Sequence, residues 1–508
     1  MHIALGIDTG GTYTDAVLVN QTDGVVLAAT KALTTHRDLA IGIGQAIAGV
    51  FAPAAALNGG APIHPADVGM VGLSTTLATN AIVEGQGSPV CLLLIGYDPA
   101  VIQRFGFERE LVTRDVVHLR GGHTVDGNEA APLDEDAART AILARRDKVA
   151  AFAISSYFSV RNPAHELRIK ALVEELTGKD GTLPSPVTCG HELTTKLDAI
   201  RRATTVALNA SLIPILHDLI RTVRRSLDDL GIAAPLMIVK GDGSLVRAEW
   251  AVQRPIETIL SGPAASVVGA WHVAGRKDVW VVDVGGTTTD IAALRDGQPR
   301  LNPEGARVGG WRTMVEAADV YTVGLGGDSH VRVPMYGASD TLHPIIGPQR
   351  ALPLCRLASE HPGIVEDLCQ QLTVRKKALY PFLGQFIMLR RRVAGLSDKD
   401  QALLALLDEG PRALFWFAQQ RQYAALLTGR IDRLIAQQAV LRAAFTPTDA
   451  LHVLGRFTAW DAEAARLGAE ILAAQAKLSV EAFCEQVVRA MSDRVATELV
   501  SKVIHDEV

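Results

Sequence analysis

The chain has 508 residues, of which 48% are hydrophobic, so it is long enough for two or more domains with large cores. Its formal net charge of −5, without a block of basic residues, argues against a nucleic-acid partner. No apolar run approaches the roughly 20 residues that span a bilayer. The N-terminus enters a predicted strand directly and lacks the features of a signal peptide. We therefore expect a cytoplasmic protein with no membrane partner.

Strands alternate with helices through the first part of the chain. Apolar segments at 3–10, 15–19 and 25–33, separated by glycine-containing breakers, predict three strands. Further strands are predicted at 69–76, 89–95 and 149–154, and helices at 38–51, 134–147, 163–177 and 197–230. This alternation predicts an α/β fold with a mixed sheet.

The character of the sequence changes after residue 333. Residues 335–445 carry few strand signals and are rich in Ala, Leu, Gln and Arg, which predicts a helical insertion. Thr446-Pro-Thr-Asp449 then predicts a capped helix start, and two more helices follow to the end of the sequence.

One phrase, D-x-G-G-T-x-T-D, occurs twice, from Asp8 to Asp15 and from Asp283 to Asp290. Each copy lies between two apolar runs, so each is predicted to be a turn between two strands. A Gly-Gly pair lets the backbone approach an anion closely, and successive N–H groups in such a turn can bind phosphate. Two matched loops can bind the phosphates of a nucleotide from opposite sides.

The side chains of the two phrases suit the same chemistry. Threonine hydroxyls add hydrogen-bond donors or reach the waters of a metal ion. A carboxylate beside phosphates is repulsive unless Mg²⁺ lies between them, so one of Asp8 and Asp283 is predicted to be a magnesium or water ligand and the other a base or a water-positioning group. The predicted phosphate-binding residues of the two loops are Gly10, Gly11, Thr12, Thr14, Gly285, Gly286, Thr287 and Thr289.

These phrases and three others resemble the hydantoinase A/oxoprolinase family, within the wider actin–Hsp70–sugar-kinase ATPase superfamily. The others are Ser74-Thr-Thr-Leu-Ala-Thr-Asn-Ala-Ile-Val-Glu84, the pair Gly190-His-Glu192 with Arg202-Ala-Thr-Thr-Val-Ala-Leu-Asn209, and Thr258-Ile-Leu-Ser-Gly-Pro-Ala264. The resemblance implies duplicated ribonuclease-H-like domains with mixed sheets flanked by helices, plus the helical insertion. We expect a first domain at 1–198, a second at 199–334, the insertion at 335–445, and C-terminal helices of an incomplete second domain at 446–508.

The resemblance also implies a reaction. Family members open cyclic amides such as hydantoins or 5-oxoproline with ATP and Mg²⁺, and related members are subunits of ATP-dependent ketone carboxylases. Phosphorylation of the amide oxygen turns a poor electrophile into a good one, which water can then attack. Partners implied by the resemblance are a small cyclic amide or ketone, a hydantoinase B-type subunit, and further copies in an oligomer.

The chain departs from the family pattern in its third glycine-rich loop and at its end. The loop that resembles G-x-G-G-G-S reads Gly324-Leu-Gly-Gly-Asp-Ser329, so an aspartate follows the predicted phosphate-binding residues Gly326 and Gly327. That aspartate is expected either to bind a metal or to weaken phosphate binding. A glycine-rich adenosine-binding turn is not found before Val508, so we expect a truncated sequence, a site completed by another chain, or impaired ATP binding.

Several side candidates remain open. His123 and His191 lie in glycine-containing loops and could bind a second metal or act as acid or base, and ordinary loop hydrogen bonding is the alternative. Thr75 and Thr76 could contact substrate or phosphate, or simply cap a helix. Asp319 could face the site or lie at a strand edge. A ketone carboxylase subunit and a non-catalytic nucleotide-binding scaffold are the alternatives to the amidohydrolase.

Overall fold

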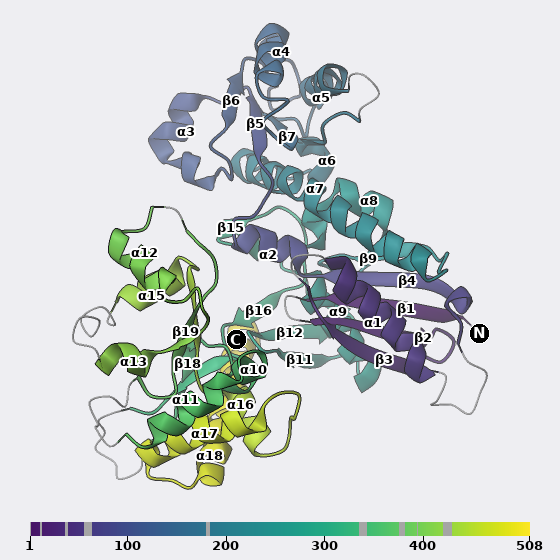
Figure 1. Ribbon diagram of the computed structural model, residues 1–508. Helices are drawn as coiled ribbons and strands as arrows, with labels where there is room; N and C mark the ends of the chain where they lie inside the picture. The colour runs from purple at the N-terminus through teal and green to yellow at the C-terminus, as the bar shows by residue number, and fades with distance from the viewer. Residues whose placement is uncertain are drawn as a thin grey trace. The chain divides into compact units, whose positions relative to one another are not determined.

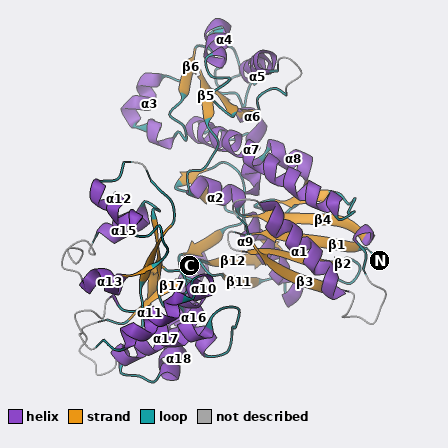
Figure 2. Cartoon of the chain, viewed as in Figure 1, coloured by secondary structure: helices purple, strands orange, loops and turns teal. Residues whose placement is uncertain are grey.

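The computed structural model describes residues 2–10, 13–35, 39–54, 63–178, 183–334, 343–374, 382–393, 395–419 and 429–507. The fold is α/β, with mixed sheets flanked by helices, as predicted (Figures 1 and 2). The chain divides into two compact units. Unit 1 comprises Met1–Val281 and Ala292–Val320, and unit 2 comprises Val282–Ile291 and Tyr321–Val508. The predicted domain boundaries remain predictions; the one at 198/199 lies at the start of helix α7.

A six-stranded mixed sheet begins unit 1, in the order β10-β9-β4-β1-β2-β3. Strand β1 is antiparallel to β2 and parallel to β4. Apolar side chains of these strands, of helix α1 and of α7 form one buried core. The bounds are β1 Ile3–Thr9, β2 Tyr13–Asn20, β3 Val26–Leu33, β4 Val68–Thr75, β9 Leu236–Val239, β10 Leu245–Arg247, α1 Leu39–Ala54 and α7 Ala199–Asp229.

A second sheet in unit 1 is entirely parallel, in the order β6-β5-β7-β8. Strands β5 and β7 are buried along their whole length, which fits their uninterrupted apolar character. The strand bounds are β5 Val90–Ile95, β6 Val116–Leu119, β7 Ala151–Ser156 and β8 Val187–Cys189. The helices between and after them are α3 Pro99–Phe105, α4 Glu135–Leu143, α5 Ala164–Thr177 and α6 Gly190–Leu193.

Helix α7 contributes to the cores beneath both of these sheets. It is the one described helix long and apolar enough to cross a membrane by length and composition. In its most apolar window, however, 78% of the helix is buried inside the fold. A core helix is buried to this extent, so packing in unit 1 explains the high hydropathy of α7.

The second copy of the repeated phrase lies at the tip of the β11–β12 hairpin. These strands belong to a sheet in the order β11-β12-β13, with β16 also pairing β12. The division between the units falls within β11 and β12, so the tip itself, Val282–Ile291, is part of unit 2. The bounds are β11 Val279–Val284, β12 Thr289–Arg295, β13 Gln298–Pro299, β14 Arg307–Val308, β15 Trp311–Arg312, β16 Val320–Val323, α2 Leu77–Val83, α8 Ala248–Gln253 and α9 Ser261–Ala274.

Unit 2 has its own core, built from helices packed on two small sheets. The sheets are β17-β18 and β20-β19-β21, so the predicted helical insertion contains strands as well as helices. The strand bounds are β17 Ser329–Arg332, β18 Ile345–Arg350, β19 Phe386–Leu389, β20 Arg412–Ala413 and β21 Val440–Ala443. The helices are α10 Leu354–Glu360, α11 Gly363–Leu372, α12 Asp398–Ala405, α13 Leu414–Gln419, α15 Arg430–Ala436, α16 Pro447–Val453, α17 Ala462–Ala476 and α18 Val480–Glu507.

Candidate functional site

The first copy of the phrase forms the turn between β1 and β2 in unit 1. Asp8 is exposed near the end of β1, and in the sheet register it lies opposite Ser74 of the parallel strand β4. The hydroxyl of Ser74 donates a hydrogen bond to the Asp8 carboxylate. The backbone N–H of Gly10 donates to the carbonyl oxygen of Tyr13 over 2.9 Å, which closes the turn. An exposed carboxylate is thereby held at the carboxyl ends of two parallel strands.

The remaining predicted residues of this loop have different environments. Thr14 is fully buried, and its hydroxyl lies 3.1 Å from that of Thr34. The Thr34 hydroxyl in turn donates to the carbonyl oxygen of Gly10 over 2.9 Å. Thr14 therefore supports the turn from inside the fold. Gly11 and Thr12 lie outside the described residues.

Thr75 and Thr76 connect β4 to helix α2. Thr75 is fully buried, and its carbonyl oxygen accepts a 2.9 Å hydrogen bond from the hydroxyl of Ser261 at the start of α9. Thr76 is partly exposed, and its N–H donates to the carbonyl oxygen of Thr9 over 3.2 Å. Thr76 is thus the accessible member of the predicted pair, next to the strand end that carries Asp8.

The second copy of the phrase, in unit 2, has the same closing hydrogen bond. Asp283 is exposed near the end of β11, and the N–H of Gly285 donates to the carbonyl oxygen of Thr288 over 2.9 Å. This bond is equivalent to the one from Gly10 to Tyr13 in the first copy. Because Gly285 and Gly286 are exposed, the turn is open to solvent.

The buried threonine is also repeated. Thr289 is fully buried and donates its hydroxyl hydrogen to the carbonyl oxygen of Leu325 over 2.7 Å. It occupies the position of Thr14 in the first phrase and has the same supporting role. Thr287 is partly exposed, so it is the threonine of the second loop that lies nearer to solvent.

The third glycine-rich loop lies directly against the second copy of the phrase. The N–H of Gly327 donates to the carbonyl oxygen of Gly285 over 3.0 Å, and the N–H of Asp328 donates to that of Gly286 over 2.6 Å. A Cβ atom at Gly326 would lie 2.5 Å from the carbonyl oxygen of Gly286, so this position requires glycine. The structure therefore brings Gly326 and Gly327 together with Gly285 and Gly286.

Two supporting contacts in unit 2 were not predicted. The N–H and the hydroxyl of Thr448 both donate to the carbonyl oxygen of Gly327, over 3.0 and 2.8 Å. The sequence T-P-T-D indicated only the cap of α16. The hydroxyl of Thr322 donates to Asp290 over 2.6 Å, and burial, with a smaller effect of the charge on Asp283, raises the pKa of Asp290. Both contacts join residues far apart in sequence, so no local pattern reveals them.

Asp319 directly precedes strand β16 and is partly buried. Its N–H donates to the carbonyl oxygen of Arg300 over 2.7 Å, and the amide of Asn302 lies 3.5 Å from its carboxylate. These contacts are those of a strand-edge aspartate.

His123 is buried at the carboxyl edge of the parallel sheet. Its ring centroid lies 4.3 Å from that of His165, and burial, followed by the charge of His165, lowers the pKa of His123. Nδ1 of His165 accepts a hydrogen bond from the N–H of Gly122, and its Nε2 lies 3.1 Å from Glu129. Among the described residues, Nδ1 of His123 has no hydrogen-bond partner. His123 is therefore a neutral imidazole packed on a second histidine.

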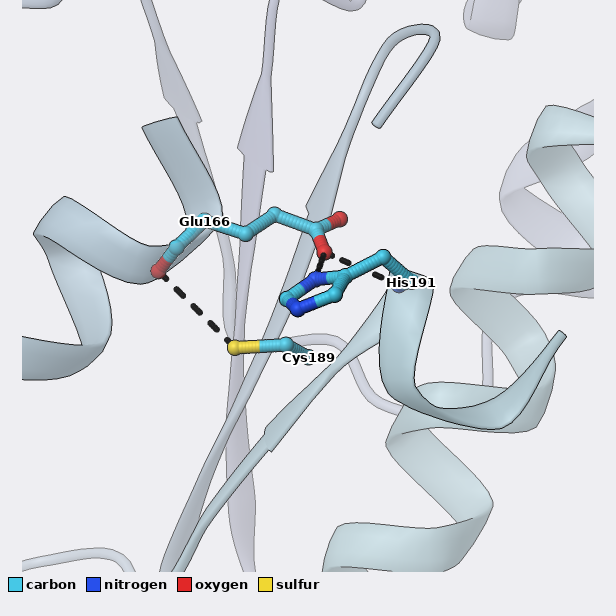
Figure 3. Close-up of side chains that lie close together, drawn as sticks. All are labelled: Glu166, Cys189 and His191. Carbon is cyan, nitrogen blue, oxygen red and sulfur yellow. Dashed lines mark hydrogen bonds and ion pairs between the residues drawn. The ribbon is translucent and has the colours of Figure 1, made fainter. Parts of the chain in front are cut away.

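His191 pairs with a carboxylate other than its sequence neighbour. Its Nδ1 lies 2.6 Å from Oε2 of the fully buried Glu166, and its backbone N–H donates to the same oxygen over 3.0 Å (Figure 3). Because an ionised carboxylate can only accept, Nδ1 carries the proton. Glu192 instead pairs with Lys170 over 2.6 Å and caps the N–H of Cys189.

Glu166, Cys189 and His191 place candidate metal-ligand atoms within 4.8 Å of one another. Two of them also make other contacts. Burial raises the pKa of the Cys189 thiol, and this thiol lies 3.8 Å from the backbone oxygen of Glu166. The Glu166 carboxylate already accepts three N–H groups, including that of Ser156 over 2.7 Å. The group is better described as a hydrogen-bonded junction between α5, β7 and α6.

Two family models match the chain. The model described as hydantoinase/oxoprolinase matches residues 202–506, and that of the hydantoinase/oxoprolinase N-terminal region matches residues 4–177. The chain belongs to the hydantoinase/oxoprolinase family. This confirms the resemblance on which the predicted site residues depend.

Characterised relatives within the hydantoinase/oxoprolinase family differ in reaction. Caprolactamase subunit alpha of Pseudomonas jessenii is 32% identical over 66% of this chain and 49% of that protein. Acetophenone carboxylase gamma subunit of Aromatoleum aromaticum is 28% identical over 69% of this chain and 50% of that protein. The chain thus spans about half the length of the curated relatives it matches.

Solved structures agree with this assignment. The nucleotide-free structure of an acetone carboxylase, from work on ATP-dependent acetone carboxylation, matches with a TM-score of 0.64 at 19% identity, over 99% of this chain and 63% of that one. The ATP-dependent caprolactamase of Pseudomonas jessenii matches with a TM-score of 0.57 at 28% identity, over 73% of this chain and 55% of that one. The first likeness shows a shared fold only.

Proposed function

We propose that this chain binds ATP with Mg²⁺ through the two D-x-G-G-T-x-T-D loops and uses it to open a cyclic amide. The supporting observation is the equivalent backbone hydrogen bond in the two loops. In each, a glycine N–H donates over 2.9 Å to the carbonyl oxygen three residues later, and an exposed aspartate precedes it. Backbone turns of this kind bind phosphate oxygens, and the aspartates accept a cation that phosphate brings with it.

The proposed residues follow from accessibility. Gly286 and the partly exposed Thr287 are proposed to contact phosphate. The N–H groups of Gly10 and Gly285 already close the turns, so these two glycines are proposed to contribute by letting phosphate approach a backbone without a Cβ atom. Gly11 and Thr12 are carried over from the family resemblance. Gly326 and Gly327 hold the second loop in place. Asp8 and Asp283 are proposed to bind Mg²⁺ or to position a water. When bound, the metal neutralises charge on the phosphates during transfer.

The proposed reaction begins at the amide oxygen of the substrate. This oxygen attacks the γ-phosphorus, a new O–P bond forms, and the bond from the γ-phosphorus to ADP breaks with its electron pair leaving on ADP. The activated carbon then accepts water, and a second water releases phosphate after the C–N bond has opened. The family resemblance assigns the later steps to a hydantoinase B-type partner subunit. The caprolactamase relative, at 32% identity, favours an amide as substrate.

ADP release tests this proposal. The wild-type chain, with and without a B-type subunit, is incubated with ATP, Mg²⁺ and hydantoin, 5-oxoproline or caprolactam. Asp8→Ala and Asp283→Ala should each lower amide-dependent ADP release at least about 100-fold, because each removes a group that acts on the transferred phosphate. The matched control is Asp23→Ala, because Asp23 is an exposed aspartate in the turn between β2 and β3. Unchanged amide-dependent ADP release in both loop variants would contradict the proposal.

A ketone carboxylase subunit is the second candidate, favoured by the acetophenone carboxylase relative. There the same loops would activate an enolisable ketone, so ADP release would require a ketone and bicarbonate instead of an amide. A third candidate, a nucleotide-binding scaffold subunit, predicts ATP binding without substrate-dependent ADP release.

A further inference from the structure

Asp328 is the residue at which the third glycine-rich loop departs from the family phrase, and its backbone is fixed in the fold. Its N–H donates to the carbonyl oxygen of Gly286 over 2.6 Å, and its own carbonyl oxygen accepts from the N–H of Ala351 over 2.9 Å. Both bonds use backbone atoms. These two hydrogen bonds therefore do not depend on the side chain of residue 328.

The side chain of Asp328 lies against the second phosphate loop. A Cβ atom built on Gly286 would be 3.4 Å from Oδ2 and 3.6 Å from Oδ1 of this carboxylate. The carboxylate is thus in van der Waals range of the exposed Gly-Gly turn proposed to bind phosphate. The Asp328 side chain itself is 23% exposed, so a ligand at the turn can reach it.

The positive charges near the Asp328 carboxylate compensate its negative charge only weakly. Within the described part of the chain, it forms an ion pair with Arg350 at 3.8 Å, which is beyond hydrogen-bond range, and the Arg350 side chain is 55% exposed. Burial raises the pKa of Asp328 to about 6, against the lowering effects of Arg350 and Arg356. An ionised carboxylate in this position gains from an additional cation.

A phosphate group alone would be repelled by this carboxylate. A phosphate accompanied by a divalent cation would be attracted, because oxygen ligands from a carboxylate and from phosphates are those that Mg²⁺ prefers. The same side chain can therefore oppose the metal-free nucleotide and favour the metal complex.

We propose that Asp328 makes nucleotide binding at the second loop depend on a divalent cation, by accepting that cation directly or through one of its waters. This inference rests on the proposed function, since it assumes that the second loop binds phosphates. It assigns to Asp328 a role in selecting metal-bound ATP over metal-free ATP.

Calorimetric titration of the full chain with ATP tests the proposal, once with excess Mg²⁺ and once with EDTA. The variants are Asp328→Asn, which keeps the shape of the side chain, and Asp328→Gly, which restores the family residue. Asp367→Asn is the matched control, because burial also raises the pKa of Asp367 but this residue lies on α11, outside the glycine-rich loops. Circular dichroism and thermal melting confirm that each variant is folded.

The wild-type chain should prefer the magnesium complex, and Asp328→Asn and Asp328→Gly should each reduce that preference about tenfold. Part of the change should be tighter binding of metal-free ATP. If the variants tighten both forms equally, the carboxylate is only an obstacle and the inference fails. It fails also if they leave both affinities unchanged. Absence of wild-type binding in both buffers would contradict the proposed function itself.

Discussion

Gly326 shows how a single residue fixes the geometry of the second loop. A side chain there would meet the carbonyl oxygen of Gly286 at 2.5 Å and that of Gly285 at 2.7 Å. The atoms involved belong to backbone, which cannot rotate away. The two glycine-rich segments can therefore stack only if residue 326 has no Cβ atom.

Gly326→Ala should lower ATP affinity at least about tenfold, because the stacked loops must separate, and should destabilise the chain by about 1–3 kcal/mol. Gly324→Ala is the matched control: it lies in the same loop, but a Cβ atom there would have no atom within 4 Å. Calorimetry and urea unfolding measure the two effects. Equal behaviour of the two variants would show that the stacking does not matter for binding.

Asp328 gives a pH-dependent prediction. Burial raises its pKa to about 6 in the folded chain, from the ordinary value of 3.8. The folded state thus favours the protonated form, so this contribution to stability is full below about pH 4 and is lost as the pH rises through about 6. Asp328→Asn should remove this contribution. Between pH 4 and 7, the unfolding free energy of the variant should then fall by about 1–3 kcal/mol less than that of the wild type. Urea unfolding in metal-free buffer measures this, and parallel curves for the two proteins would contradict it.

At the scale of elements, Glu166 joins α5 to the end of β7 and the start of α6. Its buried carboxylate accepts three N–H groups, from Ser156 and twice from His191. In Glu166→Gln, the amide NH₂ must face at least one of these donors. We expect a loss of about 1–3 kcal/mol in unfolding free energy. Glu174→Gln, an exposed position on the same helix, should change stability little. A similar loss of unfolding free energy in both variants would contradict a stabilising role for the Glu166 hydrogen bonds.

The sequence predicted the regular elements well where the apolar pattern was long. The three N-terminal strands and the long helix at 197–230 are confirmed as β1 to β3 and α7, and the helix predicted at 134–147 is found over a shorter range as α4, Glu135–Leu143. Strands β18 to β21 were missed within 335–445, because they have two to six residues and alternate too little to reveal a period of two. Their pairing partners are distant in sequence, so only tertiary structure defines them.

The candidate site was predictable in part for a related reason. Repetition of the phrase revealed both loops, and the family resemblance added Gly326 and Gly327. The phrase could not show that Thr14 and Thr289 are buried supports, because their exposure depends on which neighbours cover them. Nor could it show that His191 pairs with Glu166, which is 25 residues away, instead of with the adjacent Glu192.

For the whole molecule, the account predicts that nucleotide stabilises the fold. ATP with Mg²⁺ at about 100 times its dissociation constant should add about 2.7 kcal/mol to the stability of the parts that bind it. Differential scanning calorimetry should therefore show a higher melting temperature with the nucleotide, and a smaller rise for Gly326→Ala. If ATP leaves the melting temperature of both the wild type and Gly326→Ala unchanged, binding of ATP by the isolated chain is contradicted.

The central claim is that both copies of the repeated phrase are needed for the chain to bind ATP with Mg²⁺. Its most direct test is the affinity of the full chain for ATP with Mg²⁺ by titration calorimetry, in wild type, Asp8→Ala, Asp283→Ala and the control Asp23→Ala. The account predicts one site per chain and at least about a tenfold loss of affinity in each of the two loop variants, with the control unchanged. Wild-type affinity in either loop variant would contradict it.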